Sequence, residues 1–545
     1  MKKLLPLIFI LLLGAILRLW MLGVIPKGIT NDEMGYVYNA YSIAKTGKNI
    51  FGEVLPFLTW VNKGGTPFLP VPTYFTAPFF LIFSLSPFVA RLPSAILGIL
   101  DIFLLFTLVN MLFKNRNLAL ISALFLAISP WHLHFSRVLY DTNFGLFFFL
   151  LGTVAFIYEI RRERLPIISL LSLFLAIYSF RGMNILFFPL SLLLVWFGYY
   201  DLKIKKKQLV VFISGVILIA CSLLLVILLN GSKYTSEAGR FFDSQKAMMD
   251  VDIQAKEAQG PLFIKRIFLN KLTYAVDNLR SNYINAFSPG FLFLNGESTQ
   301  IYSINTRGRI YFIDSLFIIL GLFYLFKINK KSSLFLILLL FSAALPAAVS
   351  GTPYSARDFF MSLIFPIFSA GGVMLITQVK RLDIKVLLLA LVAFIYLYSF
   401  SSYLFDYYER FAFYSAEPWF KSLKDISSIV LREKNNYDEV IVGTSSFQDE
   451  LQYAFYSKTN PLDVQKSWKQ SLKDGDGSYK LNKVQFLEQC YEGSADGKPP
   501  VFRGYRKVVY IVHEGCGVYI PSRAEVKDYF GNIVWKVYSI DYAKS

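Results

Sequence analysis

The chain has 545 residues, of which 55% are hydrophobic and 17% are charged, whereas roughly a quarter of the residues are charged in an ordinary soluble protein. Its formal net charge of +18 does not indicate nucleic-acid binding, because the basic residues form short clusters between apolar runs, as in membrane proteins. The three cysteines are too few for a disulfide framework or a structural zinc site. Composition therefore predicts an integral membrane protein.

Apolar segments long enough to cross a bilayer recur along most of the chain. The first could be mistaken for a signal peptide, but it approaches the ~20 residues that a span needs and lacks a small-residue cleavage site. We therefore interpret it as a membrane helix. We expect about eleven spans, at about 4–24, 87–112, 117–131, 143–160, 166–181, 183–200, 209–230, 310–327, 333–349, 358–378 and 386–404.

The basic residues between these segments predict the orientation of the chain, because cytoplasmic loops are enriched in Lys and Arg. With the N-terminus in the cytoplasm, every second loop should be basic, and an odd number of spans puts the C-terminus outside. We expect a multi-pass protein of the plasma (cytoplasmic) membrane. The clusters that fall on its cytoplasmic side are Lys2/Lys3, Lys114/Arg116, Arg161/Arg162/Arg164, Lys203/Lys205/Lys206/Lys207, Lys327/Lys330/Lys331 and Lys380/Arg381/Lys385.

Three long stretches are expected on the outer side, at about 25–86, 231–309 and 405–545. The last resembles a small soluble α/β domain, with an amphipathic helix near 417–434 and strands near 438–442, 507–512 and 533–538. Two predicted domains result, a transmembrane domain at 1–404 and an extracytoplasmic domain at 405–545. Cys490 and Cys516 both fall in the tail, where a disulfide or two free thiols are alternatives.

The first outer stretch carries an acidic pair, Asp32 and Glu33, at the start of a predicted helix that ends near Gly47. Thr30 followed by Glu33 fits a capping box, so Glu33 is either a structural cap or a functional carboxylate. Asp32 lies in the first helical turn, where the helix dipole favours its ionised form. An ionised carboxylate at the membrane edge suits a general base.

Basic residues and histidines are also expected at the outer boundary. Lys63 and Arg91 each suit an interfacial anchor. Arg137, Arg181 and Arg357 would lie where an anionic headgroup lies, and as a set they favour phosphate binding. His132 and His134 could ligate a metal, with His134 the better candidate, but no third ligand is evident nearby.

The order of these residues resembles the polyprenyl-phosphate-sugar-dependent glycosyltransferases of the GT-C fold, in particular the protein O-mannosyltransferases and the bacterial lipid A aminoarabinose transferases (glycosyltransferase family 39 and its relatives). The resemblance covers most of residues 1–400. It is carried by Asp32-Glu33, the Lys63-Gly64-Gly65-Thr66-Pro67 element, Arg91-Leu92-Pro93-Ser94, Pro130 with His134, Ser136 and Arg137, FSPGFLFLNGE at 287–297, and Arg357 with Pro366. The tail resembles a domain found on some bacterial members.

The resemblance implies transfer of one sugar from a polyprenyl-phosphate carrier to an acceptor hydroxyl at the outer face, with inversion. It implies Asp32 as the base, Glu33 as an orienting residue, and Lys63, Arg137 and Arg357 as ligands of the donor phosphate, with Arg91 structural. The departing phosphate is already an anion, so no acid is required, and a divalent metal is optional. The expected partners are the lipid-linked sugar, membrane lipids and a protein, lipid or glycan acceptor, and no nucleic acid.

Other functions remain open. A transporter or flippase of lipid-linked sugars would have ionisable residues and helix breaks in mid-membrane, often in paired halves, whereas most charges here are predicted at the outer boundary. An oligosaccharide transferase or glycan ligase would fit the same topology. A non-catalytic scaffold is disfavoured by the joint presence of Asp32, Lys63 and Arg137. The sugar and the acceptor are not specified by the sequence.

Overall fold

The computed structural model describes residues 4–60, 67–235, 244–352, 354–443, 449–474, 478–487, 489–492, 499–502 and 504–542. The chain divides into two compact units, and each combines segments that are distant in sequence. The first unit comprises Met1–Trp20 and Ser94–Leu404, and the second comprises Met21–Pro93 and Phe405–Ser545.

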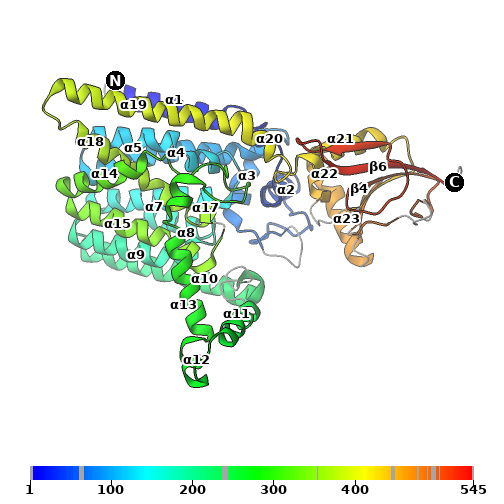
Figure 1. Cartoon of the computed structure of the whole chain (residues 1–545), viewed down its shortest axis with the longest axis horizontal. Coiled ribbons are helices and arrows are strands. Elements are labelled where there is room, and N and C mark those ends of the chain that lie inside the picture. Colours follow the sequence, from blue (N-terminus) through cyan, green and yellow to red (C-terminus); the bar gives the residue numbers. More distant parts are fainter. Residues whose placement is uncertain are drawn as a thin grey trace. The chain divides into compact units, whose positions relative to one another are not determined.

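The first unit is a bundle of apolar helices that run side by side (Figure 1). Each of the eleven segments predicted to span the membrane overlaps one of them. Within the described residues, seven helical stretches are long and apolar enough to cross a bilayer, so the chain is a multi-pass membrane protein. The helices are α1 (Leu5–Leu19), α4 (Pro87–Phe113), α5 (Arg116–Ile128), α7 (Asp141–Arg161), α8 (Ile167–Ile177), α9 (Met183–Tyr200), α10 (Lys206–Thr235), α14 (Asp314–Ile328), α15 (Lys330–Ala343), α18 (Phe365–Ile376) and α19 (Leu382–Phe405).

Small residues allow the helices to approach each other closely. A β-carbon at Gly321 of α14 would lie 1.7 Å from the carbonyl oxygen of Phe368 in α18, and one at Gly372 would lie 2.4 Å from that of Phe317. Both positions therefore need glycine. Close backbone contact of this kind is how apolar helices associate in a bilayer, where no hydrophobic force drives them together.

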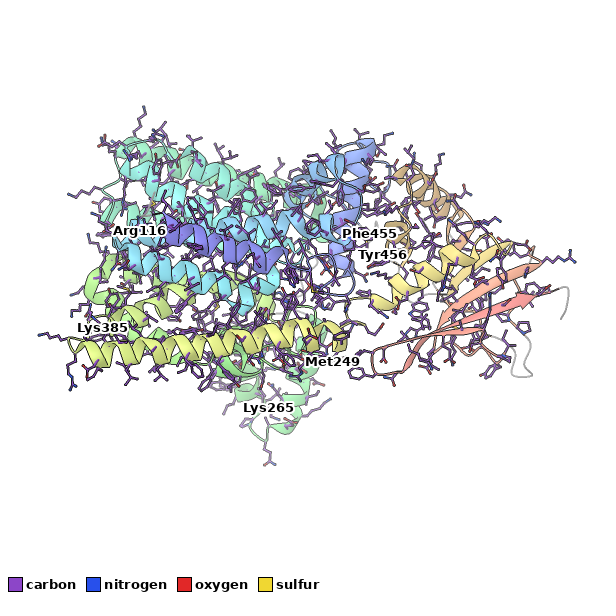
Figure 2. All side chains as sticks on the ribbon, turned by 90° about the horizontal axis from the view of Figure 1, so that it is seen from above. Arg116, Met249, Lys265, Lys385, Phe455 and Tyr456 are labelled. Atoms are coloured by element: carbon purple, nitrogen blue, oxygen red, sulfur yellow. A yellow bond between two sulfur atoms is a disulfide. The ribbon has the colours of Figure 1, made fainter. Side chains whose placement is uncertain are left out.

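Loops predicted to be cytoplasmic lie together at one end of the bundle. Arg161 donates to the carbonyl of Met111 at 2.7 Å, Lys205 pairs with Glu163, and Lys331 donates to the carbonyl of Tyr200. Arg116 and Lys385 lie at this same end (Figure 2). The structure thus groups the basic loops on one side, as the positive-inside pattern requires.

Shorter helices connect the long ones. They are α6 (Pro130–Phe135), α11 (Ser244–Glu257), α12 (Leu262–Phe268), α13 (Lys271–Asn285), η2 (Gly290–Leu294), α16 (Leu345–Ser350), α17 (Tyr354–Arg357) and η3 (Phe359–Leu363). The α11–α13 segment leaves the bundle sideways (Figure 1).

The second unit contains α2 (Asn31–Thr46), α3 (Pro70–Ile82) and the tail. The tail holds a six-stranded sheet with the order β2-β3-β1-β4-β6-β5, in which β1 pairs in parallel with β3 and β4 and the other pairs are antiparallel. Its strands are β1 (Glu439–Gly443), β2 (Tyr479–Leu481), β3 (Val484–Leu487), β4 (Lys507–His513), β5 (Ala524–Lys527) and β6 (Ile533–Asp541), and its helices are η4 (Asp406–Phe411), α20 (Ala412–Tyr414), α21 (Lys421–Glu433), α22 (Asp449–Tyr456) and α23 (Pro461–Asp474).

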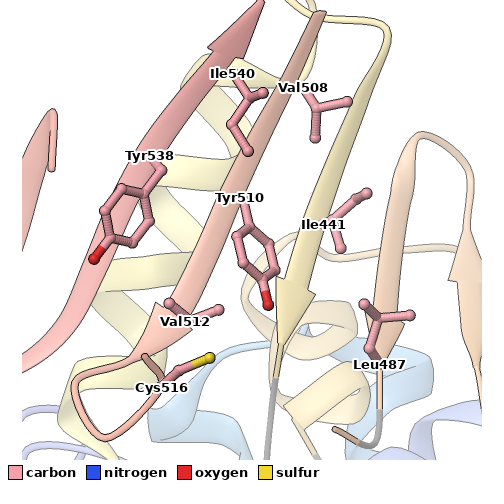
Figure 3. Close-up of a cluster of buried hydrophobic side chains, with 8 residues drawn as sticks. All are labelled: Ile441, Leu487, Val508, Tyr510, Val512, Cys516, Tyr538 and Ile540. Carbon is pink, nitrogen blue, oxygen red and sulfur yellow. The ribbon is translucent and has the colours of Figure 1, made fainter. Parts of the chain in front are cut away.

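The three predicted strands correspond to β1, β4 and β6, which are neighbours inside this sheet. Their apolar side chains build a compact core (Figure 3), formed by Ile441, Leu487, Val508, Tyr510, Val512, Cys516, Tyr538 and Ile540. Cys490 and Cys516 form a disulfide at its edge. Of the two alternatives for these cysteines, the structure therefore contains the disulfide and not a pair of free thiols.

The tail predicted as a separate domain shares its compact unit with the first outer stretch. The reason is that α2 packs against α22 and α23. Tyr38 of α2 donates to the carbonyl of Thr459 at 2.9 Å, and the ring of Phe51 packs edge-on against Trp468. The helix that carries Asp32 is thus built into the folded tail.

Candidate functional site

Helix α2 begins with the capping box that its sequence predicts. The Thr30 hydroxyl accepts a hydrogen bond from the backbone N–H of Glu33 at 3.2 Å, and the Glu33 carboxylate accepts one from the N–H of Thr30 at 3.1 Å. These two contacts satisfy amide groups that a helix start leaves without an intrahelical partner. They fix the backbone on both sides of Asp32.

Glu33 is also the partner of a buried arginine. Arg91, near the start of α4, donates from Nε to Glu33 Oε1 at 2.9 Å and from Nη2 to Oε2 at 3.2 Å, and the side chains are 0% and 1% exposed. The remaining Arg91 donors contact the carbonyls of Leu22, Pro26 and Gly28. This bidentate pair ties α2 to α4 and to the chain before it.

The loop before α2 is held by close packing. A β-carbon at Gly28 would lie 1.8 Å from the carbonyl oxygen of Trp419, so this position admits only glycine. The Arg91 guanidinium lies over the Trp419 ring, 5.7 Å from its centroid. The expectation that Arg91 has a structural role agrees with these contacts.

Asp32 occupies the second position of the helix and is exposed. Its neighbour Glu33 points into the protein, whereas Asp32 lies on the accessible side of the first turn. The positive end of the helix dipole stabilises a carboxylate here. Of the two acidic residues, Asp32 is the one that is accessible to solvent.

The tail contributes residues next to this helix start. Gln452 of α22 is fully buried and donates to the carbonyl of Ile29 at 2.8 Å and to Asn31 Oδ1 at 3.5 Å. Tyr456 of the same helix lies near the ion pair, where burial raises the pKa of its hydroxyl, Arg91 lowers it and Glu33 raises it. Sequence reasoning found no site residue in the tail, because these contacts join positions more than 400 residues apart.

In the first unit, Arg137 is fully buried and caps the end of α1. Its guanidinium donates to the carbonyl of Leu17 at 2.7 Å and to that of Arg18 at 3.2 Å. Cations at a helix C-terminus satisfy its last carbonyls. These contacts explain Arg137 as a structural residue, and its expected role as a phosphate ligand stays a prediction.

His134 is also buried, and its Nε2 donates to the carbonyl of Ile301 at 2.9 Å. This contact fixes the loop after η2 onto α6 and engages one of the two ring nitrogens. Within the described parts of the chain, there is no group of three or more His, Cys, Asp or Glu residues that could hold a metal ion. The residues present there do not form a metal site.

Arg357 is half-buried at the end of α17, and it donates to the carbonyls of Ser350 and Thr352. The start of the same helix is capped by Glu297, whose carboxylate accepts the N–H groups of Tyr354 and Ser355 at 3.0 and 3.1 Å. Glu297 ends the FSPGFLFLNGE segment, whose sequence alone does not indicate a role for this carboxylate. Its acceptor geometry shows that it orders the segment that carries Arg357.

A buried polar chain in the bundle was missed by sequence reasoning. Arg18 Nη2 donates to His132 Nδ1 at 2.8 Å, and His132 Nε2 donates to Asp101 Oδ2 at 3.3 Å. Charges within apolar helices are costly and usually have a partner or a function. The presence of Arg18 and Asp101 in apolar segments was therefore the sequence signal for this polar chain. The chain joins α1, α4 and α6, and thereby orders the connection that holds His134 and Arg137.

Asp32 and Glu33 belong to the second unit, and His134, Arg137 and Arg357 belong to the first. Within the second unit, Glu33 pairs with Arg91. Within the first unit, Arg357 lies in the segment that Glu297 orders. Lys63, the remaining expected phosphate ligand, lies outside the described residues.

Comparison with known proteins supports the predicted resemblance. Residues 66–227 match the family model described as dolichyl-phosphate-mannose-protein mannosyltransferase. No curated protein sequence matches the chain significantly. The fold is similar to ArnT from Cupriavidus metallidurans bound to undecaprenyl phosphate, with a TM-score of 0.53, 10% identity, and coverage of 98% of each chain.

The fold is also similar to the archaeal oligosaccharyltransferase AglB from Archaeoglobus fulgidus, solved with an inhibitory peptide and a dolichol-phosphate. The TM-score is 0.50 at 14% identity, and the match covers 93% of this chain and 69% of that one. At these identities the likeness establishes the fold. The predicted membrane fold with a small C-terminal sheet is thereby confirmed, while the number of spans and their orientation stay predictions.

Proposed function

We propose that this chain, which has the GT-C membrane fold and matches the mannosyltransferase family model over part of its length, is a membrane glycosyltransferase that uses a lipid-phosphate-linked sugar. In detail, it would transfer one sugar from a polyprenyl phosphate to an acceptor hydroxyl, with inversion. The observation that carries the catalytic assignment is the exposed Asp32 carboxylate on a helix start fixed by the buried Glu33–Arg91 pair.

Asp32 would act as the general base. Attack of a hydroxyl on the anomeric carbon requires a group that takes the hydroxyl proton as the new bond forms. A carboxylate in the first turn of α2 lies at the positive end of the helix dipole, which favours the anion. The cap and the ion pair prevent the helix start from moving, so the base is held in place without the substrate.

The leaving group would be the phosphate of the carrier lipid. The bond from the anomeric carbon to the phosphate oxygen breaks with its electron pair, and the carrier departs as a polyprenyl phosphate. Because that oxygen leaves as part of a phosphate anion, cations can stabilise it and no acid is needed. Arg357 and Lys63 are the preferred ligands, and Arg137 would serve indirectly by holding α1 and α6.

The carrier tail needs an apolar path along the bundle. A groove of about 450 Å³ lies between α9 and α15 on the flank of the first unit, with an apolar lining that includes Leu192, Trp196, Tyr283, Leu338 and Phe341. An isoprenoid chain matches such a surface in polarity. We place the reaction on the extracytoplasmic side of the plasma membrane, in accordance with the predicted orientation.

The test is the Asp32→Asn variant in membranes supplied with a panel of labelled polyprenyl-phosphate sugars, with products identified by mass spectrometry. Loss of the base should reduce transfer by about 10²–10⁴-fold, with donor binding retained. The matched control is Glu53→Gln, which neutralises another exposed carboxylate of the same unit. Near-full transfer by a folded, inserted Asp32→Asn protein would refute the base assignment.

The same membranes distinguish the enzyme from a flippase. A transferase gives a new glycosylated product and free carrier phosphate, whereas a flippase moves intact donor between leaflets without cleaving it. Movement of intact donor by the wild-type protein, with no product from any sugar in the panel, would contradict the proposed activity.

A further inference from the structure

Residues 244–285 form an arm on the first unit, made of α11, α12 and α13. The arm extends away from the bundle across the direction of the long helices (Figure 1), and Met249 and Lys265 mark its place in the second view (Figure 2). It follows α10, so it leaves the bundle on the side that the sequence predicts to be outside. A helical segment that runs across the direction of the spanning helices is suited to lie along a bilayer surface.

The arm has an apolar surface that its own fold leaves uncovered. No residue of α12 or α13 is buried, and Phe263 is 74% and Leu272 is 72% exposed. Large exposed apolar patches on a protein mark contacts with another protein or with a membrane. The other exposed apolar side chains of the arm are Met248, Met249, Ile253, Leu262, Ile264, Ile267, Phe268, Val276, Leu279 and Ile284.

The apolar side chains of α13 fall on one face. Leu272, Val276, Leu279 and Tyr283 recur at a spacing of three or four residues, which places them in a single stripe. Tyr283 also lines the groove between α9 and α15, and its hydroxyl donates to the carbonyl of Phe341 at 3.1 Å. The stripe is therefore continuous with a flank of the spanning bundle.

The tip of the arm carries only positive charge. Between residues 258 and 271 the sequence contains Lys265, Arg266 and Lys271 and neither Asp nor Glu. Arg266 and Lys271 are exposed, and Lys265 donates to the carbonyl of Ala255 at 2.9 Å. Apolar side chains beside exposed cations are the composition of helices that lie in a membrane interface.

We propose that this arm is an interfacial membrane anchor whose tip, residues 258–271, inserts into a leaflet containing anionic phospholipids. The side chains of α12 and the α13 stripe would lie among the upper acyl chains. The three cations would lie at the level of the lipid phosphates, where basic residues are attracted to an anionic surface. The continuity of the stripe with the bundle flank favours a bilayer over a protein partner.

The test is site-directed spin labelling of the full chain in liposomes that contain no polyprenyl donor. Cys221 is the free cysteine of the described chain, so labels are introduced in a Cys221→Ser background at Phe263→Cys and at Asp277→Cys. Asp277 is the matched control, because it is 63% exposed on another face of α13. Accessibility to oxygen and to a water-soluble nickel chelate reports the depth of each label.

The label at position 263 should be more accessible to oxygen than to the nickel chelate, and the label at 277 should be more accessible to the nickel chelate. Equal nickel accessibility at the two positions would overturn the anchor. The insertion at 263 should deepen when phosphatidylglycerol is added to phosphatidylcholine. This deepening with phosphatidylglycerol should be abolished by a triple variant that combines Lys265→Glu, Arg266→Glu and Lys271→Glu. It should be preserved in Lys256→Glu, an exposed control on α11. A response to phosphatidylglycerol that survives the triple reversal would overturn the assignment of these cations to lipid headgroups.

Discussion

At the scale of single residues, the acidic pair Asp32-Glu33 separates into two different environments. Glu33 is buried against Arg91 and closes the capping box, whereas Asp32 is exposed one position earlier. Neighbouring residues of a helix point about 100° apart, so a buried structural carboxylate and an accessible one can be adjacent in sequence. The Glu33 contacts favour a structural over a catalytic role.

Replacement of Arg91 by lysine should destabilise the protein strongly, although the charge is conserved. A lysine amine cannot supply the fork that contacts both Glu33 oxygens and three backbone carbonyls. Removing one partner of a buried pair costs about 3–5 kcal/mol, and we expect a loss toward that range. Thermal unfolding of the purified protein in detergent measures it.

The control is Arg410→Lys. Arg410 pairs with Asp406 at 2.9 Å in the same unit, but its side chain is 54% exposed, so the change should cost at most about 1 kcal/mol. Equal losses for the two variants would contradict a special role for the buried pair.

How far residue roles could be predicted depends on the distance in sequence over which they act. The capping box connects Thr30 to Glu33, three residues apart, and its spacing was readable. The partners of Arg91 lie about sixty residues away, and those of Arg137 more than a hundred. A single sequence contains no signal that pairs such positions, so the contacts of Arg137 with the end of α1 could not be predicted, and its role as a phosphate ligand stays a prediction.

At the scale of elements, helix α22 of the tail positions the start of α2. Gln452 donates to the carbonyl of Ile29, three residues before Asp32. Gln465 of α23 makes equivalent contacts with Ser42, Thr46 and Asn49 at the opposite end of α2. Both glutamines are buried, so they form a matched pair that differs in distance from the proposed base.

Gln452→Ala should therefore reduce the turnover number of sugar transfer several-fold, with little change in the KM for the donor. Each truncation leaves buried acceptors unpaired, which costs about 1–3 kcal/mol of stability, so Gln465→Ala should lower the melting temperature similarly and leave turnover nearly intact. Steady-state kinetics with thermal unfolding separates the two effects. Equal turnover in both variants would show that the tail only stabilises α2.

The elements that the sequence predicts are those with a strong periodic pattern. The apolar runs and the strands β1, β4 and β6 were recognised, because long buried segments differ plainly in composition from loops. Strands β2, β3 and β5 contain only three or four residues, and β2 and β5 are the two edge strands of the sheet. Such strands gain their stability from pairing with neighbours, which the local sequence does not encode.

At the scale of the whole molecule, the basic loops and the disulfide give two independent indications of orientation. The loops at 111–116, 161–163, 200–205 and 331 contact one another at one end of the bundle, and such loops remain in the cytoplasm. The Cys490–Cys516 bond lies in the tail, and disulfides persist in oxidising compartments. Both observations agree with the predicted orientation, in which the tail lies outside the cytoplasm, and the orientation itself stays a prediction.

Labelling with a membrane-impermeant maleimide tests this orientation in intact cells. The paired Cys490 and Cys516 do not react with maleimides, so a Cys221→Ser background needs no further change. A cysteine at Tyr519, which is 60% exposed in the tail, should be labelled in intact cells. A cysteine at Glu163, which is 66% exposed in a basic loop, should be labelled only after permeabilisation.

Both side chains are exposed, so a difference in labelling cannot be due to the burial of one of them. Labelling of position 163 in intact cells, with protection of 519, would reverse the chain in the membrane and move Asp32 to the cytoplasmic face, where an extracytoplasmic acceptor could not reach it.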